Sequence, residues 1–354
     1  MTVTITDAIE TLPAAREFVG DRASALDKAE TDTRVDIAKM GELGLFAPGC
    51  HGRPLSEMVT VIEQVAAESL AAGFSAWAHR MALEYVSRGP EPVRRKYAAA
   101  LESGELVGVT AMAAGMKYCA GLGDVPLVAE QVDGGIRVSG PIRWASNLYD
   151  GALIVFPARA ADGGSHYIAA APVSSDGVTV NSAPGLLALG GTASTSLEFT
   201  DVFVPEDSII SSEMCDFIAD VRPSFLLLQT AFCIGSTGTS VAESAKHLGG
   251  LGEGFADEHE LLAHEHDSAR ERLYRFADAV STVGAQAPTA RELIQLRLDG
   301  SRLAMTATRL EATLRGGAGY ATSSSTNRRF REAAFLPVQS PSEGQLRWEL
   351  ARSN

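Results

Sequence analysis

The spacing of apolar residues changes twice along this chain, and that change restricts the possible folds more than any other feature of the sequence. In residues 1–108 apolar side chains recur every three or four positions, as in the stretch 35–45, which is the spacing of amphipathic helices. Residues 109–213 carry short apolar or alternating runs between Gly-rich turns, and residues 214–354 return to the helical spacing. Helices, then strands, then helices predict an α+β fold rather than alternating βαβ units. A dinucleotide-binding parallel sheet is therefore not expected.

Individual elements can be placed from the same pattern, with Gly and Pro marking their ends. We expect helices over residues 35–45, 55–70, 74–86, 91–102, 224–247, 258–283, 289–315 and 341–352. We expect strands over residues 127–131, 136–139, 152–158, 166–171, 178–180 and 196–204. The segment 224–247 is long and strongly apolar, so we expect it to be a core helix.

Composition and charge exclude several classes of protein. The chain has 354 residues, with 30 Lys and Arg against 44 Asp and Glu, and thus a formal net charge of −14. This acidic balance argues against a general nucleic-acid binder, which needs a basic face. No uncharged apolar window reaches the roughly 18 residues of a membrane span. The first residues, MTVTITDAIE, lack the basic and apolar regions of a secretory signal. We therefore expect a cytoplasmic protein.

The cysteines and histidines follow no disulfide or metal motif. Cys50, Cys119, Cys215 and Cys233 are widely spaced, so we expect them to be reduced thiols, as is usual in a cytoplasm. The run 259–266 contains histidines at spacings of five and then two residues. Such spacing directs the rings around a helix rather than to one side of it. We expect no metal site.

The most informative segment for function is Trp-Ala-Ser-Asn at residues 144–147, which ends a predicted strand. An indole supplies a flat face for a planar ring system. A neighbouring hydroxyl can hydrogen-bond a ring nitrogen. Trp144 and Ser146 are therefore candidates for binding a flat cofactor. The alternative is that Trp144 is only a structural residue of the strand region.

Several further motifs occur in a fixed order along the chain. They are Leu43–Pro48 (LGLFAP), Ser103–Leu106 (SGEL), Val138–Asn147 (VSGPIRWASN), Leu189–Gly191 (LGG), Phe199–Pro205 (FTDVFVP), Gly316–Tyr320 (GGAGY) and Arg328–Ala333 (RRFREA). In order and spacing, these motifs and the three zones resemble the acyl-CoA dehydrogenase superfamily of flavoproteins. The resemblance covers nearly the whole chain.

The resemblance implies an N-terminal helical domain over residues 1–108, an antiparallel β-barrel domain over 109–213 and a C-terminal four-helix bundle over 214–354. It also implies a homotetramer or homodimer that binds FAD between the barrel and the C-terminal helices. In that family the equivalents of Trp144 and Ser146 contact the flavin ring, and the glycine segment approaches the pyrophosphate. The implied cofactor-binding positions are Trp144, Ser146, Asn147, Met112, Ala113, Gly316, Gly317 and Gly319.

The chain departs from the family pattern where the chemistry is decided. Acyl-thioester dehydrogenation needs a carboxylate base, which most members carry nine residues after the equivalent of Arg331. That position is Ser340 here, although Glu343 follows three residues later. The segment 224–226, where other members place the base, has no carboxylate. The arginine motif that holds the adenine half of FAD is replaced by the Gly-rich, acidic stretch 248–260, so FMN is an alternative cofactor.

Members of the superfamily that lack this base include flavin-dependent monooxygenases. These accept reduced flavin from a separate reductase and hydroxylate small molecules through a flavin C4a-hydroperoxide. The resemblance therefore favours a monooxygenase in which Ser146 donates to flavin N5 and His79 orients the substrate or supplies a proton. The alternatives are an acyl-CoA or acyl-carrier-protein dehydrogenase that uses Glu343 as its base, and a non-catalytic paralogous subunit.

Overall fold

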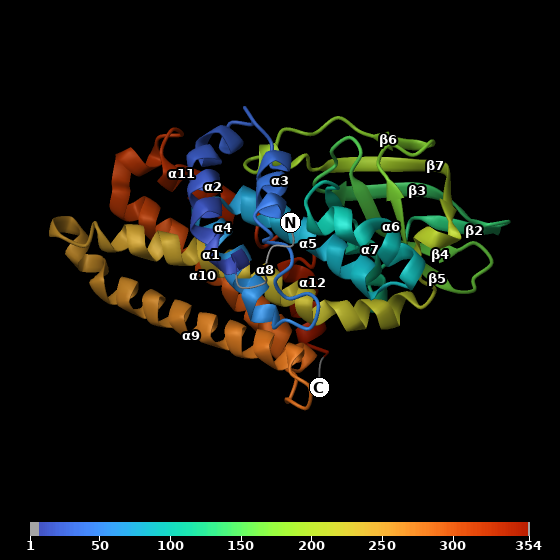
Figure 1. Cartoon of the computed structure of the whole chain (residues 1–354). Helices are drawn as coiled ribbons and strands as arrows, with labels where there is room; N and C mark the ends of the chain where they lie inside the picture. The colour runs from blue at the N-terminus through green and yellow to red at the C-terminus, as the bar shows by residue number, and fades with distance from the viewer. Residues whose placement is uncertain (1–6, 353–354) are drawn as a thin grey trace.

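The computed structural model describes residues 7–352 and places a sheet beside two regions of packed helices (Figure 1). The first region contains α1 (Asp7–Glu10), α2 (Leu12–Asp27), α3 (Arg34–Glu42), α4 (Leu55–Glu68), α5 (Leu70–Arg88) and α6 (Glu91–Glu102). Every residue of α5 from Leu70 to Val86 is buried. A helix without a solvent face must be covered on all sides, and α5 lies at the centre of the molecule, between the other helices and the sheet (Figure 1).

The strands form one sheet in the order β6-β7-β3-β2-β4-β5-β8, with β1 added beside β4. Their bounds are β1 (Gly108–Thr110), β2 (Val128–Val132), β3 (Gly135–Ala145), β4 (Leu153–Ala160), β5 (His166–Pro172), β6 (Val178–Val180), β7 (Thr195–Pro205) and β8 (Ile209–Ser211). The sheet is mixed rather than fully antiparallel, because β1 and β2 each pair with β4 in parallel. Parallel neighbours need a crossover connection. The chain makes it through α7 (Ala113–Cys119) and the β2–β3 hairpin.

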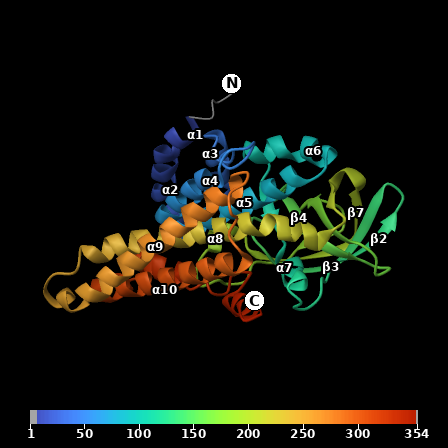
Figure 2. The same cartoon turned by 90° about the horizontal axis from the view of Figure 1, so that it is seen from below.

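The C-terminal helices pack around α8 (Met214–Ala245). They are α9 (Ala256–Ser281), α10 (Ala290–Tyr320), α11 (Ser325–Ala333) and α12 (Glu343–Leu350). The long helices α8, α9 and α10 run side by side (Figure 2), and α8 also contacts α4 and α5. By length and composition α8 could cross a membrane, but 78% of its most apolar window is buried inside the protein, as in the core helix of a globular fold.

The predicted α+β order is confirmed, with differences at element ends. α8 begins at Met214 rather than at residue 224, because Pro223 lies inside the helix instead of before it. The gap between helices that we expected at residues 70–74 is only one residue long, Ser69, between the end of α4 and the start of α5. The Ser69 side chain accepts a hydrogen bond from the Ala72 N–H and so caps α5. Helix α7, which the sequence analysis did not predict, occupies part of the strand region.

The expectation that all cysteines are reduced is wrong for two of them. Cys119 and Cys215 form a disulfide, with their Cα atoms 5.5 Å apart. Their separation of 96 residues hid this pair from a reading of sequence spacing. The last residue of α7 and the second residue of α8 meet because the two helices pack together, with Gly115 against Ile218. Cys50 and Cys233 are buried free thiols.

The contact between α8 and α4 predicts a strong effect of Gly235→Ala on stability. A Cβ atom at Gly235 would lie 2.0 Å from the Glu63 carbonyl oxygen, so one helix must move. We expect the free energy of unfolding to fall by about 1–3 kcal/mol. Gly20→Ala in α2 is the matched control, because its Cβ would meet nothing closer than 3.4 Å. That variant should gain up to about 1 kcal/mol of helix propensity. Equal urea midpoints for the two variants would contradict this account of the contact.

Candidate functional site

The segment singled out by the sequence leaves the sheet at the end of β3. Trp144 is 55% exposed, which is unusual for so large an apolar side chain. Asn147, in contrast, is fully buried and adopts a left-handed backbone conformation with φ 63°. Its Nδ2 donates to the carbonyl oxygens of Ser75 (3.0 Å) and Gly108 (3.2 Å). Asn147 therefore joins α5 to β1 through its amide nitrogen. Its Oδ1 is buried without a partner among the described residues, so the cofactor contact expected of Asn147 stays a prediction.

Ser146 is the first member of a chain of hydroxyl groups. Its Oγ lies 2.7 Å from Ser194 Oγ, which lies 2.6 Å from Thr192 Oγ1, and Thr192 donates to the Leu189 carbonyl at 2.7 Å. Each hydroxyl has one hydrogen. All three contacts are satisfied together only if Thr192 donates to Leu189, Ser194 to Thr192, and Ser146 to Ser194. Ser146 then offers only lone pairs to a ligand, so it is an acceptor and not the donor predicted from the sequence.

His79 is a structural residue in this fold. The ring is fully buried in α5, and its Nδ1 accepts a hydrogen bond from the Gly108 N–H at 2.9 Å. Its Nε2 lies 2.8 Å from the Leu101 carbonyl oxygen and must donate to it. Burial lowers the pKa of His79 to about 4. Both nitrogens are occupied, so the predicted role of His79 in substrate orientation or proton supply is corrected. The polar ring lies on a buried helix because it bonds backbone groups of β1 and α6.

Met112 and Ala113, two of the implied cofactor-binding positions, lie at the start of α7. Met112 precedes α7, and its side chain is 1% exposed. Ala113 begins the helix, and the Met116 N–H donates to the Met112 carbonyl at 2.9 Å. The Met112 side chain belongs to the core, so only backbone groups of this segment can serve a cofactor.

The glycine segment at the end of α10 divides into two parts. Gly316 has φ 56° and ψ −142°, which kinks the helix, and a Cβ at Gly316 or Gly317 would meet no atom within 4 Å. Backbone in such open surroundings can be approached closely by a phosphate. At Gly319 a Cβ would lie 2.6 Å from Arg315 Cβ and 3.1 Å from Thr326. Gly319 is therefore required for packing rather than for the predicted cofactor contact.

The two positions proposed for the base lie in different surroundings. Glu343 is in the first turn of α12, half-buried, and its Oε1 is 2.7 Å from Arg347 Nε. This ion pair on the helix surface does not fit the catalytic role considered for Glu343. Ser340 faces the interior: its Oγ is buried without a partner among the described residues, and its carbonyl accepts from Gln229 Nε2 at 2.9 Å.

Sequence reasoning missed the polar cluster that surrounds Ser340. Arg297 in α10 is 1% exposed, and its Nε donates to Gln229 Oε1 at 3.2 Å. Its Nη2 donates to the Leu336 carbonyl and to Gln339 Oε1, both at 3.1 Å. A signal was present, because Gln229 interrupts the apolar run 225–234 and Arg297 lies one helical turn after Leu293, on the apolar face of its helix. Polar residues at core positions are informative because core positions are normally apolar.

Aromatic side chains fill the space between α5 and α8 next to this cluster. The Trp77 ring centroid lies 4.9 Å from that of Phe225 and 5.6 Å from that of Phe74. Phe74 in turn contacts Phe335, with centroids 5.0 Å apart, and Phe232 packs against Trp77 at 5.9 Å. Trp77 is 3% and Phe232 0% exposed. The cluster gives the region an apolar wall and excludes water from it.

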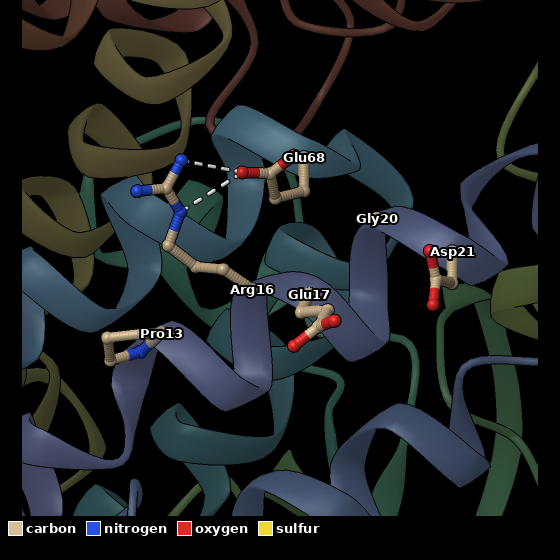
Figure 3. Close-up of a pocket in the computed structure, with 6 residues that line it drawn as sticks. All are labelled: Pro13, Arg16, Glu17, Gly20, Asp21 and Glu68. Carbon is tan, nitrogen blue, oxygen red and sulfur yellow. Dashed lines mark hydrogen bonds and ion pairs between the residues drawn. The ribbon is translucent and has the colours of Figure 1, made fainter.

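Two surface hollows lie elsewhere. One, of about 320 Å3, is formed by α2 and Glu68, and the Arg16–Glu68 ion pair (2.6 Å) crosses it while Glu17 and Asp21 line it (Figure 3). The other, of about 580 Å3, lies on α9. Neither is lined by a residue that the sequence analysis singled out, and we do not assign the site to them.

The fold is similar to that of solved acyl-CoA dehydrogenases. Glutaryl-coenzyme A dehydrogenase in complex with glutaryl-CoA matches with a TM-score of 0.86 and 18% identity, over 99% of this chain and 96% of that one. Butyryl-CoA dehydrogenase from Megasphaera elsdenii gives 0.85 and 15%, over 99% of both chains. PigA with FAD and proline gives 0.84 and 16%, over 99% of this chain and 98% of PigA. No protein-family profile and no curated protein sequence matches the chain. The chain has the acyl-CoA dehydrogenase fold.

His79 makes a prediction about stability and pH. Its folded pKa, about 4, is below the ordinary value of 6.5, so the unfolded chain binds the proton more tightly. The contribution of the neutral ring is complete above pH 6.5 and is lost as the pH falls toward 4. We expect His79→Gln to lower the free energy of unfolding at pH 7.5, and the difference from wild type to shrink by about 2 kcal/mol between pH 6.5 and pH 4.5. A difference independent of pH, measured by urea unfolding, would contradict the buried neutral ring.

Proposed function

We propose that this chain, which has the acyl-CoA dehydrogenase fold, binds FAD and acts as a flavin-dependent oxidoreductase that hydroxylates a small molecule with dioxygen. The observation that carries this proposal is that neither position where the superfamily carries its base, Ser340 or the segment 224–226, has a carboxylate, and that the nearby Glu343 is already engaged. Ser340 lies among neutral groups and a buried cation, and Glu343 is paired with Arg347 on the surface. Removal of a proton next to a thioester carbonyl needs a carboxylate there.

The residues at the end of β3 fit a flavin ring. The 55% exposed indole of Trp144 provides an uncovered aromatic face, on which a planar ring can stack. Ser146 Oγ, two residues on, presents lone pairs because its hydrogen is directed to Ser194. The open backbone at Gly316 and Gly317 suits a pyrophosphate. We propose that Trp144 and Ser146 hold the ring and that this glycine pair serves a neighbouring subunit of a homo-oligomer.

The direction of the hydroxyl chain has a consequence for the redox state of the cofactor. A bound flavin would supply the electrons and the oxygen chemistry of the reaction. N5 carries a hydrogen in reduced flavin and none in oxidised flavin, and Ser146 Oγ is arranged to accept a hydrogen. The chain's hydroxyls therefore favour the reduced form. This agrees with a protein that receives reduced flavin from a separate reductase.

A second candidate function, a binding subunit without catalysis, is favoured by one observation. The aromatic side chains between α5 and α8 leave that region closely packed, with Trp77 3% and Phe74 5% exposed. A protein that remains colourless and cannot be reconstituted with FAD or FMN would support this function over the proposed one.

Trp144→Ala should weaken flavin binding. Stacking on one aromatic face contributes about 0.5–1.5 kcal/mol beyond buried area, which corresponds to a two- to tenfold rise in Kd. The measurement is a titration of the flavin-free protein with FAD and, separately, with FMN, followed by flavin fluorescence. Phe203→Ala is the control, because Phe203 is an aromatic residue of similar exposure, 43%, on the neighbouring strand β7. Unchanged affinity in Trp144→Ala would remove Trp144 from the site.

The proposed reaction class predicts that an acyl thioester does not reduce the flavin. Anaerobic mixing of the FAD-loaded protein with butyryl-CoA should leave the flavin absorbance at about 450 nm unchanged, since no carboxylate is placed to remove the proton. Glu343→Gln should behave like wild type, because Glu343 is engaged with Arg347. Bleaching in wild type that is lost in Glu343→Gln would instead identify a dehydrogenase with Glu343 as its base.

A further inference from the structure

Arg297 is a buried cation without an anionic partner. Four arginines are buried among the described residues: Arg80, Arg297, Arg328 and Arg329. Arg80 pairs with Glu84, Arg328 with Glu332 and Arg329 with Glu311. In the part of the chain that the structure describes, no carboxylate lies within 4.0 Å of Arg297. Its acceptors are neutral amide or peptide oxygens. Because a buried charge is costly unless it is compensated, Arg297 points to an anion that comes from outside the chain.

Unused hydrogen-bond donors surround the same guanidinium. Gln339 is 4% exposed, its Oε1 accepts from Arg297, and its Nε2 has no partner among the described residues. Ser340 Oγ is likewise buried without a partner, and Gln229 links the Ser340 carbonyl to Arg297. No hydrogen bond from Arg297 Nη1 is found in the described range. The free groups on Arg297, Gln339 and Ser340 are all potential donors. Two of them, Gln339 Nε2 and Ser340 Oγ, are fully buried, and buried donors without acceptors are unfavourable.

The cluster borders an aromatic wall. Phe335 precedes Leu336, whose carbonyl accepts from Arg297, and its ring contacts Phe74 with centroids 5.0 Å apart. Phe225 lies one helical turn before Gln229 on α8, and its ring contacts Trp77 at 4.9 Å. The unpaired cation and the unused donors call for an anionic end, and the aromatic side chains beside them are best matched by a flat apolar body. A single cation is neutralised by a monoanion, so a carboxylate fits better than a phosphate dianion.

We propose that Arg297, Gln339 and Ser340 form a binding site for the carboxylate of an aromatic acid. The inference that an aromatic acid is the substrate of the hydroxylation rests on the proposed function. The inference that the site binds a carboxylate depends only on the contacts described. A donated N–H or O–H from each residue and the charge of Arg297 would hold the carboxylate, and the aromatic side chains of α5 and α8 would shift to contact the ring.

The first test is binding of benzoate to the flavin-free full chain, measured by isothermal titration calorimetry and by the unfolding temperature. Benzamide, neutral and nearly isosteric, is the matched ligand. We expect benzoate to bind and to raise the unfolding temperature, and benzamide to do neither. Arg297→Met should weaken benzoate binding at least tenfold. Equal responses to the two ligands, or no response to benzoate, would overturn the proposal.

The second test places a carboxylate of the protein itself beside Arg297. Its outcome does not depend on whether the Arg297→Met variant folds. Gln339→Glu places a carboxylate of the same shape where Oε1 already accepts from Arg297. We expect a higher unfolding temperature than wild type and loss of the benzoate response. Gln286→Glu, the same charge change at an exposed residue of the α9–α10 loop, is the control and should leave both unchanged. A destabilised Gln339→Glu that still binds benzoate would refute the site. Flavin titration of the same proteins is a separate readout, so a failure of flavin binding and a failure of the anion site are distinguishable.

Discussion

The packing of α8 against helices from both halves of the chain is the contact on which the rest of the structure depends. α8 contacts α4 and α5 of the N-terminal region and α9 and α10 of the C-terminal region. The approach to α4 is close enough that Gly235 has no room for a side chain. Burial of an apolar helix on all sides is favourable because each face removes apolar surface from water. It also fixes where the side chains of α8, Gln229 among them, meet the loop that carries Ser340.

Buried polar groups then fasten the sheet to this helical core. Asn147 and His79 each satisfy backbone groups that would otherwise be buried without partners, at the junction of α5, α6 and β1. Such groups are expensive to leave unpaired, so these residues set the position of the end of β3 relative to α5. The exposed Trp144 and the hydroxyl chain of Ser146 take their places from this junction. His79, expected to act on the substrate, thus instead helps to position Trp144 and Ser146, and the Asn147 amide nitrogen shares this positioning role.

The electrostatics around Ser340 agree with the loss of a base. A carboxylate at this position would join a cluster that contains a buried guanidinium, which stabilises the ionised form and lowers the pKa of the acid. A carboxylate stabilised in this way is a weak base. A serine, with donors and a cation around it, is instead suited to hold an anion. The proposed hydroxylation and the proposed acid-binding site therefore follow from the same arrangement of Arg297, Gln229 and Gln339.

The sequence by itself determined the order of helices and strands, because apolar periodicity is a local property that each segment carries. It also placed Trp144 and Ser146 at the end of a strand and, through the resemblance to the superfamily, predicted that Ser340 stands where most members carry a carboxylate. Only the tertiary structure decided which side chains face one another. The Cys119–Cys215 disulfide, the occupied nitrogens of His79 and the neutral partners of Arg297 all join residues far apart in the chain. Such contacts depend on how helices pack, and spacing along the sequence does not contain that information.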